Sequence, residues 1–83
     1  MERILVVEDE ESVREVISEF LTGWGYETVL AENGQKGLDL FRSQSFAMVV
    51  TDIRMPVMDG LTMLKSIRKE DAKIPIIVVT GYP

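Results

Sequence analysis

The sequence predicts an α/β fold, a doubly wound parallel sheet with helices on both of its faces. Short runs of apolar, mostly branched residues alternate with segments whose apolar residues recur at helical spacing. Several of the short runs show no polar alternation, which is typical of strands buried on both faces of a parallel sheet. Crossovers between parallel strands are right-handed, so we expect helices to cover both faces.

Four strands are expected along the chain. Residues 4–7, 47–51 and 76–79 are almost entirely apolar, and residues 27–30 form a weaker strand. The first helix follows the first strand, and its apolar positions recur at helical spacing: Val13, Val16, Ile17, Phe20, Leu21 and Trp24. We expect Trp24 to close this helix against the sheet.

Two further helices fill the remaining gaps. Asn33 can cap the second helix, although Gly37 is an unfavourable helical residue. Asp59 provides a turn before the third helix, and Met63 is expected to lie partly in the core. Three residues mark the apolar positions of the third helix: Leu61, Leu64 and Ile67.

Composition excludes several classes of function. The chain of 83 residues is at most one small domain, and an apolar content of 46% is too high for disorder. It has neither cysteine nor histidine, which excludes disulfides, thiolate metal sites and imidazole catalysis. A net charge of -5 argues against direct nucleic-acid binding. No apolar run could span a bilayer and no signal-peptide core is visible, so we expect a cytoplasmic protein without membrane contact.

Polar residues stand at the ends of three predicted strands: Glu8 and Asp9, then Asp52, then Thr80. The carboxyl ends of parallel strands lie at one edge of a sheet, where ligands bind. A cluster of carboxylates repels itself unless a cation neutralises it, and oxygen ligands favour Mg²⁺ or Mn²⁺ over Zn²⁺. A carboxylate beside such a cation can accept a phosphoryl group, and the Thr80 hydroxyl could donate a hydrogen bond to it.

Three segments in this order resemble bacterial response-regulator receiver domains: ILVVEDE at 4–10, VVTDIRMPVMDG at 49–60 and IIVVTG at 76–81. The resemblance covers the whole chain and implies a flavodoxin-like sheet with strand order 2-1-3-4. It implies that Asp52 accepts phosphate from a sensor histidine kinase or phosphotransfer protein. Glu8 and Asp9 would form the acidic pocket that holds Mg²⁺. The main-chain carbonyl of Arg54 would be another ligand, and Thr80 would be the switch hydroxyl.

Receiver domains also have a fifth strand, which carries a lysine that contacts the phosphoryl group. No counterpart occurs up to Pro83, so we expect residues 1–83 to be the N-terminal part of a receiver domain, without the fifth strand and the last two helices. Residues 76–79 would then form an open apolar edge. We expect the 83-residue chain to self-associate through this strand.

Other functions fit the sequence less well. A metal-dependent phosphatase with an aspartate nucleophile would need a second aspartate two residues later, where this chain has Arg54. A flavin-binding protein of the same topology would not place acids at the first strand-helix junction, because they repel a phosphate. An assembly fragment that folds only by pairing remains compatible with a signalling switch. We therefore expect a switch that is not an enzyme.

Overall fold

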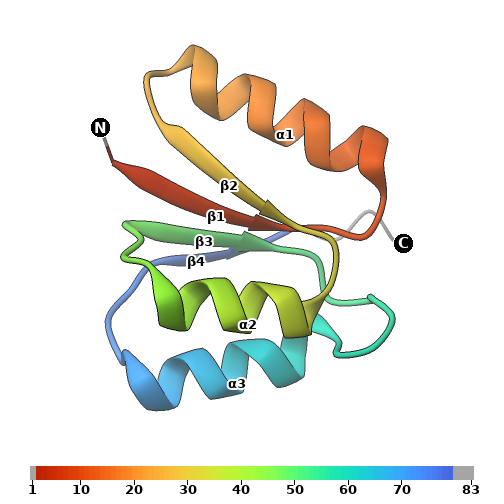
Figure 1. Ribbon diagram of the computed structural model, residues 1–83, viewed down its shortest axis with the longest axis vertical. Helices are drawn as coiled ribbons and strands as arrows, with labels where there is room; N and C mark the ends of the chain where they lie inside the picture. Colours follow the sequence, from red (N-terminus) through yellow and green to blue (C-terminus); the bar gives the residue numbers. More distant parts are fainter. Residues whose placement is uncertain (1, 80–83) are drawn as a thin grey trace.

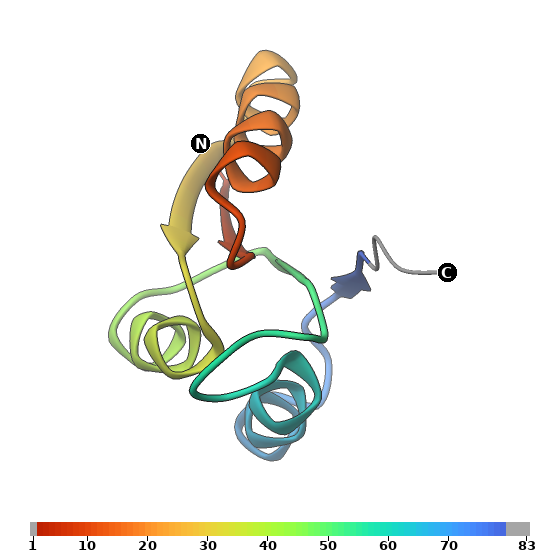
Figure 2. The same ribbon diagram turned by 90° about the vertical axis from the view of Figure 1, so that its right-hand side faces the viewer.

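The sheet sits between two unequal helical layers in the computed structural model, which describes residues 2–79. Four parallel strands lie in the order β2-β1-β3-β4: β1 (Arg3–Val7), β2 (Glu27–Ala31), β3 (Met48–Thr51) and β4 (Ile76–Val78). The three helices are α1 (Glu11–Gly23), α2 (Gly34–Ser43) and α3 (Gly60–Glu70). Helix α1 covers one face of the sheet, and α2 and α3 cover the other (Figures 1 and 2). The predicted fold class and strand order are confirmed.

The register of the central strands brings their carboxyl ends level. Val7 of β1 lies opposite Thr51 of β3 and opposite Ala31 of β2. The pairing extends one residue further, because the Asp52 N–H donates to the Val7 carbonyl oxygen at 3.0 Å. Glu8 and Asp52 therefore leave the sheet side by side.

The main core lies between the sheet and the α2–α3 layer. Leu5, Val7 and Val49 of the sheet pack with Met63 and Ile67 of α3, and all five are buried. Met63 is fully buried, deeper than the sequence indicated, whereas Leu61 is half exposed. The inner face of α3 follows Gly60, Met63 and Ile67, positions that are three and four residues apart.

The opposite core, under α1, is smaller. It contains Ile4, Val6 and Val50 of the sheet, and α1 contributes only partly buried side chains to it. The expectation that Trp24 packs on the sheet is wrong, because its side chain is 76% exposed. Trp24 follows Val16 and Phe20 at steps of four residues, and this row lies beside the face that touches the sheet, so all three side chains are exposed.

The helix starts are set by side-chain caps where the sequence predicted them. Asn33 Oδ1 accepts a hydrogen bond from the Lys36 N–H at 2.9 Å, and Asp59 Oδ1 accepts one from the Thr62 N–H at 2.8 Å.

In the part of the chain that the structure describes, no helix has the length and apolar character needed to cross a bilayer.

Candidate functional site

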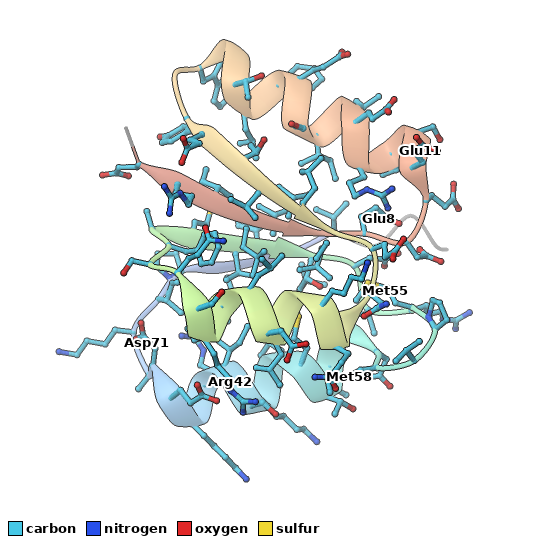
Figure 3. All side chains as sticks on the ribbon, in the orientation of Figure 1. Glu8, Glu11, Arg42, Met55, Met58 and Asp71 are labelled. Carbon is cyan, nitrogen blue, oxygen red and sulfur yellow. The ribbon has the colours of Figure 1, made fainter. Side chains whose placement is uncertain are left out.

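Three acidic side chains converge where β1 and β3 end. Glu8 and Asp9 follow β1, and Asp52 follows β3. Each offers a carboxylate oxygen, and these three oxygens lie within 4.8 Å of one another. Figure 3 shows Glu8 at this end of the sheet, on the same side of the molecule as Met55 of the β3–α3 loop. The structure thus brings together the three carboxylates that the sequence singled out.

Glu8 is the buried member of the cluster, with 5% of its surface exposed. Its Oε2 accepts a hydrogen bond from the Glu10 N–H at 2.9 Å, which fixes the carboxylate in place. Burial, together with contact with Asp9 and the charge of Asp52, raises the pKa of Glu8 to about 7, and the hydrogen bond from Glu10 only partly opposes this rise. The site therefore holds more negative charge than its surroundings stabilise.

This excess negative charge fits a hard divalent cation. The donors are carboxylate oxygens, the ligands that Mg²⁺ prefers, and their mutual distance lets one ion contact all three. A cation among them would offset the charges of Asp9 and Asp52, which add to the effect of burial in raising the pKa of Glu8. Asp9 is exposed and Asp52 half-buried, so solvent reaches the cluster from outside.

Asp52 is held by the chain on both of its sides. Its N–H pairs with β1, and its own Oδ1 accepts the Ile53 N–H at 2.7 Å. Arg54 follows in the β3–α3 loop, with its side chain on the surface. Thr80, the expected switch hydroxyl, lies outside the described residues.

The β3–α3 loop, residues 52–59, is tied to itself and to α2. The Gly60 N–H donates to the Ile53 carbonyl at 2.7 Å, which closes the loop at its base. The Gly34 N–H donates to the Met58 carbonyl at 3.0 Å, which ties the loop to α2. Val57, between these ties, has a φ of 71°, a left-handed conformation that is strained for a branched residue.

Arg14 of α1 is a site neighbour that sequence reasoning missed. Its Nη1 donates to the main-chain carbonyl of Glu8 at 2.7 Å, so the helix braces the turn that carries Glu8 and Asp9. An arginine in the first turns of an amphipathic helix gives no signal of this role. The direction of the side chain becomes evident only in the folded structure.

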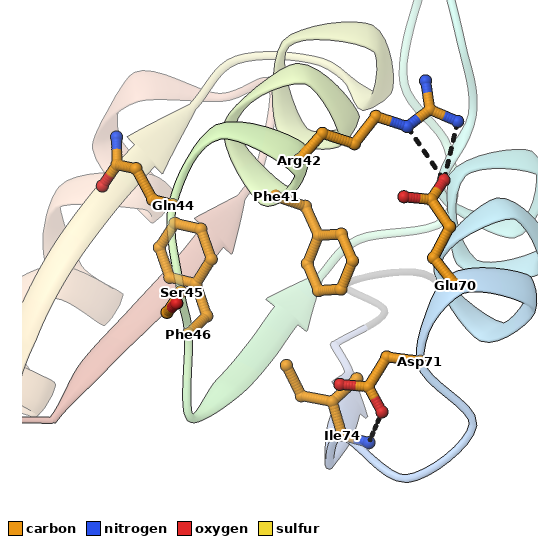
Figure 4. Close-up of a pocket in the computed structure, with 8 residues that line it drawn as sticks. All are labelled: Phe41, Arg42, Gln44, Ser45, Phe46, Glu70, Asp71 and Ile74. Carbon is orange, nitrogen blue, oxygen red and sulfur yellow. Dashed lines mark hydrogen bonds and ion pairs between the residues drawn. The ribbon is translucent and has the colours of Figure 1, made fainter.

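A separate hollow of about 320 Å³, drawn in Figure 4, lies where α2 and α3 end and β3 and β4 begin. The acidic cluster lies at the other ends of the strands. The Arg42 guanidinium and the Glu70 carboxylate form an ion pair at 2.7 Å across it. Asp71 accepts the Ile74 N–H at 3.1 Å. The Arg42–Glu70 ion pair thus links α2 to α3, and Asp71 bonds to the main chain that follows it, so this hollow is not part of the acidic cluster.

The comparison with known families decides the identity of the fold. Residues 4–83 match the response regulator receiver domain. The chain belongs to this family. In this receiver domain, Glu8, Asp9 and Asp52 lie at the carboxyl ends of the strands.

Two solved structures show how closely this receiver domain follows the family. The response regulator TrrA from Thermotoga maritima, solved in complex with Mg²⁺–BeF, is 44% identical, with a TM-score of 0.95 over 99% of this chain and 71% of that chain. The chemotaxis protein CheY4 from Vibrio cholerae is 30% identical, with a TM-score of 0.93 over 100% of this chain and 71% of that one. The flavodoxin-like fold with order 2-1-3-4 is thus confirmed by its neighbours.

Curated relatives are much longer proteins. The receiver domain is 40% identical over 79 residues to the transcriptional regulatory protein ZraR from Escherichia coli, covering 95% of this chain and 18% of ZraR. It is 43% identical over 80 residues to the probable transcriptional regulator ycf27 from Porphyra purpurea, covering 96% of this chain and 32% of that protein. The chain therefore spans only a minor part of these relatives.

Proposed function

We propose that this receiver domain is a phospho-accepting switch of a two-component phosphorelay, with Asp52 as the acceptor. The observation that carries the proposal is the convergence of the Glu8, Asp9 and Asp52 oxygens within 4.8 Å at the ends of two adjacent strands. Asp52 is the member that is half-buried yet fixed at its main chain, so its second carboxylate oxygen can meet an incoming group in a defined position.

Each site residue has a proposed task. Glu8, Asp9 and Asp52, with the main-chain carbonyl of Arg54, would hold Mg²⁺, and the bound ion would supply positive charge to the oxygens of the transferring group. An Asp52 carboxylate oxygen would attack phosphorus and form a bond to it while the bond between phosphorus and the donor's histidine nitrogen breaks. That nitrogen would keep the electron pair of the broken bond and take up a proton from solvent. We assign to the Thr80 hydroxyl a hydrogen bond to the phosphoryl oxygen.

The proposed donor is a sensor histidine kinase or a phosphotransfer protein. This is supported by the relative TrrA, which has also been solved in complex with the histidine kinase ThkA. In that structure TrrA is 43% identical, with a TM-score of 0.92 over 100% of this chain and 72% of that one.

The negative net charge of -5 disfavours direct nucleic-acid contact by this domain. We also propose a cytoplasmic location, without membrane contact. Arg54, at the position where a phosphatase would need an acid, favours a switch over an enzyme.

Labelling of the full-length protein with a small radioactive phosphodonor tests the assignment. The wild type should incorporate phosphate only with Mg²⁺ present, and Asp52→Asn should abolish incorporation. Asp59→Asn is the matched control, because asparagine can cap α3 as aspartate does, so labelling should persist. Labelling that survives in Asp52→Asn would refute the assignment of the acceptor.

We also propose that the isolated polypeptide of residues 1–83 self-associates through β4. Within residues 2–79, β4 pairs only with β3, and Ile77 and Val78 are partly exposed. An apolar strand with an open edge is a template for pairing with another chain.

A further inference from the structure

We propose that Gly34, the first residue of α2, is a positioning residue for the divalent-cation site. It would act by holding the β3–α3 loop, and with it the Arg54 carbonyl, at the correct distance from the acidic cluster. This inference rests on the proposed function, which places Mg²⁺ at that cluster.

The contact between Gly34 and the loop is made by main-chain atoms on both sides. The Gly34 N–H donates to the Met58 carbonyl oxygen at 3.0 Å. A Cβ on Gly34 would collide with that oxygen and would lie 3.0 Å from the Met58 carbonyl carbon and 3.1 Å from the Asp59 carbonyl oxygen. Backbone atoms cannot rotate away as side chains do. Any other residue at 34 would therefore displace the loop itself.

A displacement at Met58 would reach the proposed ligand, because the loop is short and closed. The hydrogen bond from the Gly60 N–H to the Ile53 carbonyl, at 2.7 Å, joins its two ends. Inside this ring, the Met58 N–H donates to the Pro56 carbonyl at 2.8 Å. Arg54 lies between these two closures. A shift of Met58 therefore changes where the Arg54 carbonyl can lie relative to Asp52.

The loop also needs an external anchor. Val57, next to Met58, has a φ of 71° and an 84% exposed side chain, so packing of that side chain does not hold the strained conformation. Such strain persists only when surrounding contacts fix the chain. The Gly34–Met58 hydrogen bond joins the residue after Val57 to a helix packed on the core, and so supplies a contact of this kind.

Gly37, one turn later in α2, provides a matched control. A Cβ there would lie 2.8 Å from Met63 Sδ and 2.8 Å from Val7 Cγ2, both side-chain atoms of the core. Gly37→Ala should therefore crowd the core and lower the free energy of unfolding, but it should leave the loop untouched.

The experiment compares Mg²⁺ affinity and stability in the full-length protein. Calorimetric titration with Mg²⁺ and urea unfolding are carried out on wild type, Gly34→Ala and Gly37→Ala. Substitution of residues that orient metal ligands typically lowers metal affinity by about tenfold to a hundredfold. We therefore expect Gly34→Ala to weaken Mg²⁺ binding by at least about tenfold. Gly37→Ala should lose stability and keep the wild-type affinity. Equal Mg²⁺ affinity in wild type and Gly34→Ala would overturn the inference and leave the proposed function standing.

A second measurement needs no variant and decides the matter if Gly34→Ala does not fold. If the Gly34–Met58 bond favours Mg²⁺ binding, then Mg²⁺ must stabilise that bond by the same factor. Mg²⁺ should therefore slow hydrogen exchange of the Gly34 amide more than that of the Gly37 amide, which donates to the carbonyl of Asn33, the N-cap residue of α2. Equal slowing of both amides would refute the role of Gly34. A wild type that binds no Mg²⁺ would refute the proposed metal site as well.

Discussion

Glu8 combines burial with two like-charged neighbours, and this has a consequence for stability at different pH values. Its pKa in the folded protein is about 7, above the ordinary value of 4.5. The folded protein therefore keeps a proton that the unfolded chain releases as pH rises between those values. Without metal, this contribution to the free energy of unfolding, roughly 3 kcal/mol, is complete below pH 4.5 and is lost as pH rises to 7 and above.

Glu8→Gln should remove this loss, because the amide carries no charge at any of these pH values. Urea unfolding in the presence of a chelator, at several pH values from 4 to 8, measures the effect. The variant should be less sensitive to pH and more stable than wild type near neutral pH, yet bind Mg²⁺ more weakly. Glu11→Gln, at the exposed start of α1, serves as the control. If Glu8→Gln kept the pH dependence of the wild type, the buried charge would not be its source.

The residues of the acidic cluster could be predicted from the sequence, whereas their supports could not. Glu8 and Asp9 follow the end of β1, and Asp52 follows the end of β3, and parallel strands bring such positions to one edge of a sheet. Arg14 acts through one long side chain, which reaches the Glu8 carbonyl. Gly34 acts through the close approach of its main chain to that of Met58. Neither kind of contact has a periodic pattern in sequence. Both depend on how helices seat against loops distant in the chain.

At the scale of elements, the β3–α3 loop is expected to be stabilised by Val57→Gly. A left-handed conformation costs an L-residue roughly 1–2 kcal/mol, while the extra freedom of glycine in the unfolded chain costs about 0.5–1 kcal/mol. Val57 is largely exposed, so little burial is lost with its side chain. The free energy of unfolding should therefore rise by about 0.5–1 kcal/mol, measured by urea denaturation.

Val57→Ala separates the backbone effect from the loss of the side chain. Alanine keeps a Cβ and therefore most of the strain at a φ of 71°. It should stabilise the protein less than glycine does. Equal gains from both substitutions would show that the backbone conformation is not the cause.

Element boundaries followed the sequence where a cap or a strand end was explicit. Asn33 and Asp59 begin α2 and α3 as predicted. The apolar positions of α1 were harder to interpret, because periodicity alone does not say how wide a stripe the sheet covers. The sheet contacts only the side of α1 that carries Ile17 and Leu21, and Trp24 lies beyond it.

At the scale of the whole molecule, we expect the polypeptide of residues 1–83 to form dimers or larger species. Among the described residues, exposed apolar side chains include Ile77 and Val78 on the free edge of β4 and the α1 row of Val16, Phe20 and Trp24. Light scattering on a sample of verified mass should give a molecular weight that rises with concentration. A monodisperse, cooperatively melting monomer at high micromolar concentration would contradict the prediction.

A pair of lysine variants locates the contact. Ile77→Lys places a charge on the β4 edge and should restore the monomer, since lysine on an edge strand opposes pairing. Leu30→Lys, at a similarly exposed position on β2 at the other edge, should not. Association that survives Ile77→Lys but not Leu30→Lys would assign the contact to β2.

The two helical layers differ in how firmly they are attached. Helix α3 is anchored by Met63 and Ile67, both fully buried, whereas α1 has no buried residue and rests on half-covered side chains. The molecule should therefore come apart in a fixed order, with α1 leaving first and β1, β3 and α3 separating last. Because Arg14 of α1 donates to the Glu8 carbonyl, departure of this helix would also release the turn that carries Glu8 and Asp9. The acidic cluster thus rests partly on the least firmly held helix, so detachment of α1 should disturb the positions of Glu8 and Asp9.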